Sequence, residues 1–161
     1  MIDGRNAAVL GGALLALAVL RARSAAQLEP GAPAEGPLGM VPTSGILQMA
    51  EAIARAEGFY APGPTIPKRC NNPGNLKRGD VGLGTVNGIT IFRTAADGWD
   101  ALYRQLDLIR RGSSAYYSPG MTIAEMGRKW TATTNEQTAW GNNVASALGV
   151  PVTTTLREAL A

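Results

Sequence analysis

The segment that decides the fold reads Ile53-Ala54-Arg55-Ala56-Glu57-Gly58-Phe59, and the loop after it contains Asn71-Asn72-Pro73-Gly74-Asn75-Leu76. Upstream of Glu57, apolar side chains recur at helical spacing between Ile46 and Ile53. This periodicity predicts a helix from about Ser44 to Glu57, and Gly58 ends it. The chain therefore places a carboxyl group where a helix stops and an Asn-rich loop begins.

Glu57 falls on the apolar side of this helix, because it follows Ile53 by four residues and Ala50 by seven. A carboxyl group there is partly desolvated, and it lies at a helix C-terminus, whose dipole disfavours negative charge. Both effects raise its pKa, and a carboxyl that titrates nearer neutrality can act as a general acid toward a glycosidic oxygen. From position alone, the other interpretation is a glutamate at the helix rim that faces solvent or bonds loop amides.

Two kinds of side chain near Glu57 suit a sugar ligand. Amides donate and accept hydrogen bonds, and aromatic rings offer flat apolar faces. The candidate substrate-binding residues are Tyr60, Asn71, Asn72, Asn75, Tyr116 and Tyr117. The Asn-rich stretch also fits a structural turn in which Asn side chains bond their own backbone, and both interpretations can hold together.

The remainder of residues 44–161 predicts one hairpin and several helices. A loop is expected over residues 60–75, and a β-hairpin over residues 84–92, with Asn87-Gly88 at its tip. Another helix is expected from about Asn135 to Leu148. The capping-box pattern, Thr followed three residues later by Asp or Glu, starts helices after Thr94, Thr122 and Thr155. The predicted fold class is α+β, mostly helical, with a minor sheet.

Residues 7–20 contain no polar side chain. As a helix rising about 1.5 Å per residue, they would cover roughly 21 Å, against a hydrocarbon core of about 30 Å. Flanking arginines that snorkel would let the segment span, so residues 1–28 predict a membrane anchor, with a signal peptide or a protein-packed helix as alternatives. Arg21 and Arg23 keep the following chain cytoplasmic, which disfavours simple export. Residues 29–43 are rich in proline and glycine and predict a linker to the domain at 44–161.

Composition excludes several kinds of chemistry. The 161 residues include no histidine, which rules out a Ser-His-Asp or Cys-His nucleophile and almost any zinc enzyme. The single cysteine, Cys70, rules out an internal disulfide framework. No metal and no organic cofactor is implied. The net charge of +3 suits an anionic polymer but does not by itself distinguish wall glycan from nucleic acid.

Four stretches together resemble phage and prophage lysozyme-like muralytic domains: Ile53–Phe59, Asn71–Leu76, Phe92–Leu102 and Trp140–Val150. In these domains a helix-terminal Glu is followed by Asn-Asn-Pro-Gly-Asn and then Leu or Ile. The resemblance covers about residues 46–160 and implies a lysozyme-like fold. It also implies cleavage of the β-1,4 bond between N-acetylmuramic acid and N-acetylglucosamine in peptidoglycan, with Glu57 matching the lone catalytic acid of the lytic transglycosylases. Unlike the soluble transglycosylases, the domain at 44–161 has no Gly-Leu-Met-Gln segment.

The type of reaction depends on a second carboxylate, which a glycoside hydrolase needs at about 5–9 Å from the first. Asp80, in the loop before the hairpin, is the best-placed candidate. Asp97 is expected to cap a helix, and Asp100 to be a surface ion-pair partner. If no carboxylate faces Glu57, a lytic transglycosylase is favoured, and we expect this reaction rather than hydrolysis.

The expected partners are peptidoglycan glycan strands, together with a membrane or other virion proteins bound through residues 1–28. The expected location is the virion, membrane-associated, with action on the periplasmic cell wall when the phage genome enters the cell. The alternative is a non-catalytic structural component of a virion or envelope complex. Nucleic acid is not expected as a partner, because Lys68, Arg69, Lys77 and Arg78 fit a solvated rim or contacts to peptidoglycan carboxylates.

Overall fold

The computed structural model describes residues 41–77, 82–132 and 134–161. The predicted apolar helix in residues 1–28, most of the predicted linker at 29–43, and Asp80 lie outside these ranges. Within them, none of the helices combines the length and the apolar character that crossing a bilayer requires.

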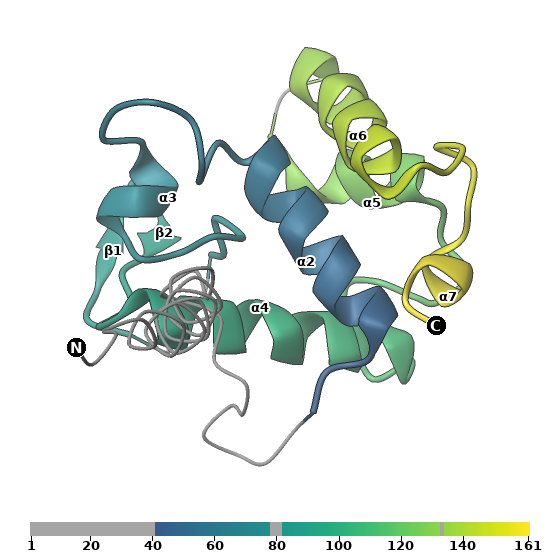
Figure 1. Ribbon diagram of the computed structural model, residues 1–161, viewed down its shortest axis with the longest axis horizontal. Coiled ribbons are helices and arrows are strands. Elements are labelled where there is room, and N and C mark those ends of the chain that lie inside the picture. Colours follow the sequence, from purple (N-terminus) through teal and green to yellow (C-terminus); the bar gives the residue numbers. More distant parts are fainter. Residues whose placement is uncertain (1–40, 78–81, 133) are drawn as a thin grey trace, which may run out of the picture. The chain divides into compact units, whose positions relative to one another are not determined.

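Helix α2, Ser44–Ala56, lies between the other elements (Figure 1). The Thr43 hydroxyl accepts from the Ile46 backbone N–H at 3.3 Å and so caps its start, and Glu57 is its C-cap residue. Its buried side includes Met49 and Ile53, both fully inaccessible to solvent. The predicted helix is therefore confirmed, with Glu57 at its end.

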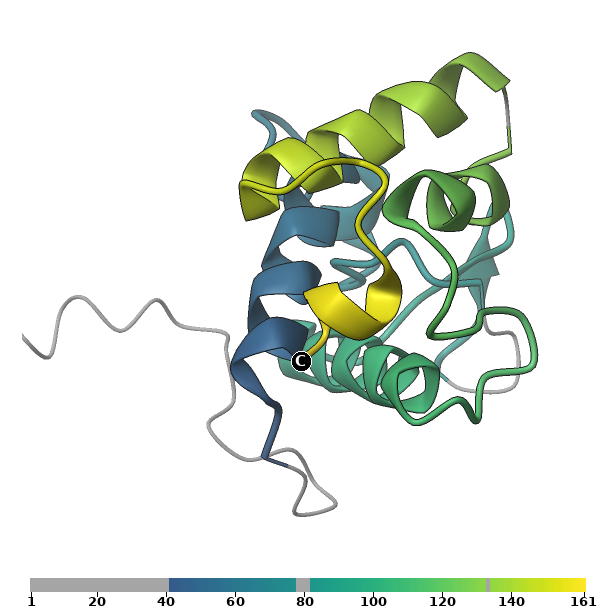
Figure 2. The ribbon, with the colours of Figure 1, turned by 90° about the vertical axis from the view of Figure 1, so that its right-hand side faces the viewer.

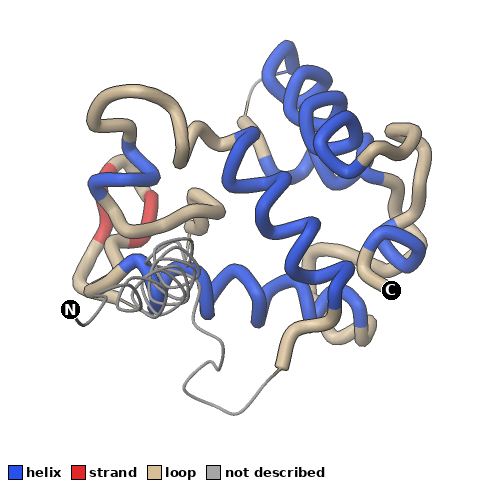
Figure 3. Tube along the Cα trace, in the orientation of Figure 1, coloured by secondary structure: helices blue, strands red, loops and turns tan. Residues whose placement is uncertain are grey.

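On one side of α2 lie the short helix α3, Ile66–Arg69, and a two-stranded antiparallel hairpin (Figure 3). Strand β1, Thr85–Val86, pairs with β2, Ile89–Thr90. Asn87 and Gly88 between them have φ values of +52° and +78°, as a type I′ turn requires. The predicted hairpin is therefore confirmed.

Helix α3 corrects the prediction of a continuous loop over residues 60–75. Its first turn contains Pro67, whose fixed φ fits that position. The Lys68 ammonium group donates to the carbonyl oxygens of Ala61 and Gly63, which ties the helix to the loop before it. Both bonds depend on the path of the loop before α3, which no repeat in the sequence indicates.

On the other side of α2 lie α5, Ile123–Trp130, α6, Thr134–Leu148, and α7, Leu156–Ala159 (Figures 1 and 2). Helix α4, Ala95–Arg110, packs against α2. Helix α6 contacts both α5 and α2, so it links the last helices to the central one. The capping boxes predicted at Thr94, Thr122 and Thr155 are all present.

The core is built where α2, α4, α5, α6 and α7 meet. Its fully buried side chains include Met49, Ile53, Leu102, Leu106, Ile109, Met126, Val144, Leu156 and Leu160. The described part of the chain is thus mostly helical with one small hairpin, as the α+β prediction states.

Candidate active site

The Glu57 carboxyl group is held by a tryptophan from a distant part of the chain. The indole N–H of Trp140, in α6, donates to Glu57 Oε1 at 2.8 Å. Trp140 is only 4% exposed and Glu57 is half-buried. The two residues are 83 positions apart in the sequence, and the packing of α2 on α6 brings them together. The helix-terminal glutamate therefore has a fixed orientation at the edge of the core, and it does not point into open solvent.

Burial raises the pKa of the Glu57 carboxyl above its ordinary value, because desolvation penalises the charged form. The hydrogen bond from Trp140, the side chains of Asn75 and Trp130, and the charge of Lys77 oppose this effect in part. The predicted direction of the shift is therefore confirmed, with desolvation as its main cause. A carboxyl in this state can donate a proton nearer to neutral pH than a solvated glutamate can.

Asn72 holds the Asn-rich loop together from inside. Its amide nitrogen donates to the carbonyl oxygens of Leu76 at 3.0 Å and Thr90 at 2.9 Å, and its Oδ1 accepts from the Leu76 N–H at 2.8 Å. Asn72 is fully buried, so none of its surface is open to a ligand. Asn71 has a similar role, since its amide donates to the carbonyls of Phe92 and Arg93. The structure gives these two predicted sugar-binding residues a structural role, the alternative that the sequence left open.

The Asn-rich loop also packs closely on α4 at Gly98. A Cβ atom at Gly98 would lie 1.9 Å from the Asn71 carbonyl oxygen and 2.9 Å from Pro73. Only a residue without a side chain allows the loop backbone to approach the helix this closely. The position of Asn71–Asn75 is therefore fixed by α4 as well as by the hairpin.

Asn75 is the asparagine that reaches Glu57, where its side chain favours the charged carboxylate. Its φ of +51° places it in the left-handed region, which Asn tolerates better than most residues. Among the hydrogen bonds of the described residues, its buried Oδ1 has no partner. Because this oxygen is buried, the role that the structure supports for Asn75 is its effect on the Glu57 carboxyl.

Three aromatic rings form a row that starts at Glu57. Trp140 stacks on Trp130, with 5.5 Å between ring centroids and 25° between planes, and Trp130 contacts Tyr117 at 5.7 Å. The Trp130 N–H donates to the Gly74 carbonyl at 3.3 Å and fixes this ring against the Asn-rich loop. The row leads away from the carboxyl into a groove.

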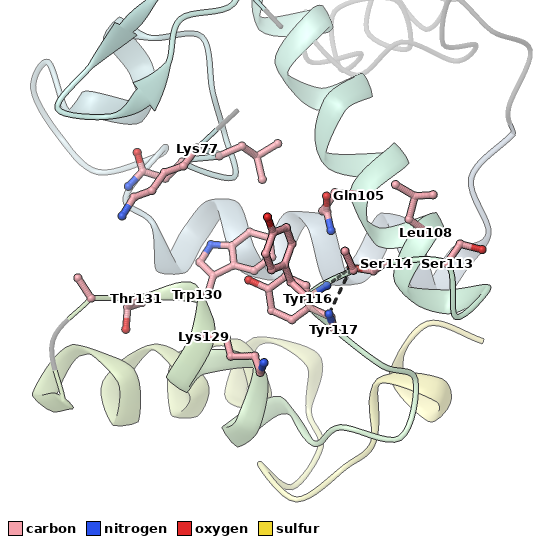
Figure 4. Close-up of a pocket in the computed structure, with 14 residues that line it drawn as sticks. Lys77, Gln105, Leu108, Ser113, Ser114, Tyr116, Tyr117, Lys129, Trp130 and Thr131 are labelled. Atoms are coloured by element: carbon pink, nitrogen blue, oxygen red, sulfur yellow. Dashed lines mark hydrogen bonds between the residues drawn. The ribbon is translucent and has the colours of Figure 1, made fainter. Parts of the chain in front are cut away.

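The groove has a volume of about 730 Å³, and its walls come from the Asn-rich loop, α4, the loop after α4 and the end of α5 (Figure 4). Tyr116, Tyr117 and Trp130 provide its aromatic surface, while Asn75 lies in its wall next to Glu57. The Ser114 hydroxyl accepts from the backbone N–H groups of Tyr116 and Tyr117 and so shapes the loop that presents them. The structure thus brings three predicted residues, Asn75, Tyr116 and Tyr117, to one groove. Glu57 and Trp140 are not among the residues that line it, and Asn75 and Trp130 connect the Glu57 carboxyl to the groove wall.

Tyr60 lies elsewhere. Its hydroxyl donates to Glu51 at 2.7 Å, its ring lies against Arg55, and it is not part of the groove wall. The proposed contact between Tyr60 and substrate therefore has no support from its position. Asp80, the predicted second carboxylate, is outside the described residues.

The other described carboxylates near these elements have partners of their own. Asp97, Glu125 and Glu158 close the three capping boxes, as predicted for Asp97. Asp100 is only 6% exposed, so its predicted place at the surface is wrong. Its predicted partner, Arg104, does act on it through its charge, and both residues line a separate pocket. Burial raises the pKa of the Asp100 carboxyl, and the charge of Arg104 opposes this shift in part.

Three residues near this site, Trp130, Trp140 and Lys129, are not among the site residues that the sequence predicts. A signal for Trp140 existed, because a buried indole N–H needs an acceptor. That acceptor could be identified only once α2 and α6 were placed together.

Comparison with known proteins returned no similarity: no family model, no curated protein sequence and no solved structure matches this chain. Among the described residues, no group of three or more His, Cys, Asp or Glu side chains is arranged to hold a metal ion. The chemistry of the site must therefore be argued from its geometry.

Proposed function

We propose that this protein cleaves the glycan strands of peptidoglycan, with Glu57 as the catalytic acid and base. The observation that supports this most directly is the half-buried Glu57 carboxyl, fixed by Trp140 beside an aromatic groove. Flat rings together with the neutral polar side chains of the groove, such as Gln105 and Thr131, suit a chain of N-acetylated sugars. The resemblance to lysozyme-like muralytic domains, and a helix ending in Glu followed by a small hairpin and further helices, agree with this assignment.

We further propose that the reaction is that of a lytic transglycosylase. Protonated Glu57 would give its proton to the oxygen that bridges the two sugars, and the bond from that oxygen to C1 of N-acetylmuramic acid would break. The C6 hydroxyl of the same sugar would then bond to C1 and lose its proton to the Glu57 carboxylate. This sequence yields a 1,6-anhydro product, restores the acid and consumes no water.

The described carboxylates favour this reaction over hydrolysis. A hydrolase needs a second carboxylate at about 5–9 Å from the acid. Asp97, Glu125 and Glu158 cap helices, and Asp107 is paired with Arg110 and Arg111. Glu51 is paired with Arg55, and Asp100 lines a separate pocket with Arg104. Asp80 remains the alternative base, in which case the products would carry reducing ends.

The proposed setting is a virion whose wall-cutting domain, 44–161, is attached to a membrane or to other virion proteins through residues 1–28. In the alternative, a non-catalytic virion or envelope component, the domain would only hold glycan. A carboxyl with a raised pKa at the edge of an aromatic groove favours the enzyme, because binding alone gains nothing from a desolvated acid.

The decisive experiment replaces Glu57 with glutamine. Glu57→Gln keeps the oxygen that Trp140 can bond but removes the proton donor, so we expect lysis of purified sacculi to fall by about 10²- to 10⁴-fold. Mass spectrometry of the fragments released by the unaltered chain should show 1,6-anhydro ends, whereas reducing ends would indicate a hydrolase. Undiminished lysis by Glu57→Gln would refute the proposal.

Stability provides the control for this variant. The pKa of Glu57 is raised on folding, so the stabilisation linked to its proton is complete at low pH and is lost as the pH rises through the folded-state pKa. Removing the charge should therefore not lower the melting temperature at pH 7. A variant that is inactive and also fails to melt cooperatively would not count as support.

A further inference from the structure

The groove beside Glu57 carries positive charge at two places. Lys77 follows the Asn-rich loop and Lys129 lies near the end of α5, and both belong to the groove wall. Figure 4 shows them on either side of the Trp130 ring. The two lysines therefore come from segments 52 positions apart in the sequence and meet only in the folded domain.

Neither lysine forms an ion pair or a side-chain hydrogen bond within the part of the chain that the structure describes, and both are exposed. Lys77 acts on the Glu57 carboxyl through its charge, but Glu57 does not line the groove. Of the described residues that line the groove, none is acidic. The remaining polar lining is neutral and includes Gln105, Ser114 and Thr131.

Several other basic side chains of the described surface are balanced locally: Arg55 by Glu51, Arg110 and Arg111 by Asp107, and Arg128 by Glu125. Arg69 and Arg157 are exposed without a described ion pair, as the two lysines are, but neither lines the groove. The groove differs in that two such cations share one aromatic surface. Two unbalanced cations on an aromatic surface favour a ligand that carries negative charge beside flat, weakly polar rings.

We propose that Lys77 and Lys129 bind carboxylates carried by the wall glycan in this groove, so that the protein selects anionic glycan over a neutral β-1,4 glycan such as chitin. The inference rests on the proposed function and makes these lysines specificity-determining residues. Two sources supply the same chemistry: the carboxyl groups of the attached peptides and, on sugars that carry no peptide, the lactyl carboxyl of muramic acid. Both project from the sugar ring, while the ring itself lies on the aromatic surface.

The test measures binding of the full chain carrying Glu57→Gln, so that the substrate is not consumed. Lys77→Ala, Lys129→Ala and the double variant are compared by cosedimentation with sacculi freed of teichoic acid. An exposed ion pair contributes modestly, so each single change should weaken binding about two- to fivefold and the double change about tenfold. Added salt should weaken the parent more than the double variant, because it screens the same charges.

Three substrates identify the ligand group. Intact sacculi carry peptide carboxyls, amidase-treated strands expose the lactyl carboxylate, and sacculi amidated at their carboxyl groups are neutralised. If binding depends on the lysines with intact sacculi and with amidase-treated strands, but not with amidated sacculi, the lysines bind both the lactyl and the peptide carboxylates. If binding no longer depends on the lysines after amidase treatment, they bind the peptide carboxylates alone.

Two control variants separate charge from structure. Lys77→Arg with Lys129→Arg keeps both charges and should retain binding, while Arg157→Ala removes one exposed charge that does not line the groove and should have no effect. Equal binding by the double alanine variant and the parent, or equal lysine dependence on amidated sacculi, would overturn the inference.

The cleavage assay distinguishes this inference from the function on which it rests. If the unaltered chain cleaves the glycan but the lysine variants bind as well as the parent, the inference is rejected and the enzymatic function stands. If binding depends on the lysines but no cleavage occurs, carboxylate recognition stands and the enzymatic function is rejected.

Discussion

The side-chain hydrogen bonds within the hairpin side of the molecule, residues 57–93, differ in range from those within the helical side, residues 94–161. On the helical side, Thr94, Thr122 and Thr155 each bond a residue three positions later in a capping box. On the hairpin side, Asn72 bonds Thr90, 18 positions away, and Asn71 bonds Phe92, 21 positions away. Short-range contacts leave a pattern in the sequence, whereas long-range contacts do not.

The two regions meet at Glu57. Its carboxyl belongs to the start of the hairpin side, and the Trp140 indole that fixes it belongs to the helical side. The candidate site therefore depends on both regions, and substitutions in the two regions should differ in their effects on stability and activity.

The largest effect is expected for Asn72→Ala on the hairpin side. This change leaves the Leu76 N–H without its buried acceptor and removes one donor each from the carbonyls of Leu76 and Thr90, although the Leu76 carbonyl still accepts from the Thr90 N–H. An unsatisfied buried group costs about 1–3 kcal/mol, so we expect the free energy of unfolding, measured in urea, to fall by about 2 kcal/mol or more. Asn142→Ala, at an exposed position of α6, is the matched control and should change stability little. A loss no larger than that of the control would mean that Asn72 does not hold the loop.

A middle-sized effect is expected where the two regions meet. Trp140→Phe keeps most of the ring packing but removes the N–H that favours the Glu57 carboxylate, so the pKa of Glu57 should rise further. The alkaline limb of the pH–activity profile should then move to higher pH. Loss of a bond worth about 1–1.5 kcal/mol should also lower the rate about tenfold.

Trp99→Phe is the matched control for this prediction, because Trp99 is a buried ring in α4 that stacks on Tyr103. It should lower stability and leave the pH profile unchanged. If both variants shift the profile equally, the shift reports general loosening of the core and not the bond to Glu57.

The smallest effect is expected on the helical side, for Thr155→Ala. Losing one helix cap costs about 1 kcal/mol, and only the short helix α7 depends on it. Thr155 lowers the pKa of Glu158, so the stability that this pair adds is present above the unfolded-state pKa and is lost as the pH falls through the folded value. In Thr155→Ala, the free energy of unfolding should lose this part of its dependence on acid pH. Thr153→Ala, at an exposed position nearby, is the control and should retain it.

Much of the fold could be predicted because its signals are local. The end of α2 at Glu57, the turn at Asn87-Gly88 and the three capping boxes each depend on residues within a few positions. Helix α3 could not be predicted in this way, because Lys68 stabilises it by bonding carbonyl groups of the preceding loop. For the same reason, the sequence showed that asparagines gather after Glu57 but not which of them face inward.

The sequence by itself determined the helix that ends in Glu57, the hairpin, and the direction in which the Glu57 pKa shifts, because spacing along one helix decides which side chains leave water. Only the tertiary structure decided that Asn72 hydrogen-bonds backbone groups of its own loop and the hairpin, that Asn75 reaches the Glu57 carboxyl, and that Trp140 fixes this carboxyl. These contacts join groups far apart in the chain, and their energies depend on distances of a few ångströms that exist only after α2, α4 and α6 have packed together.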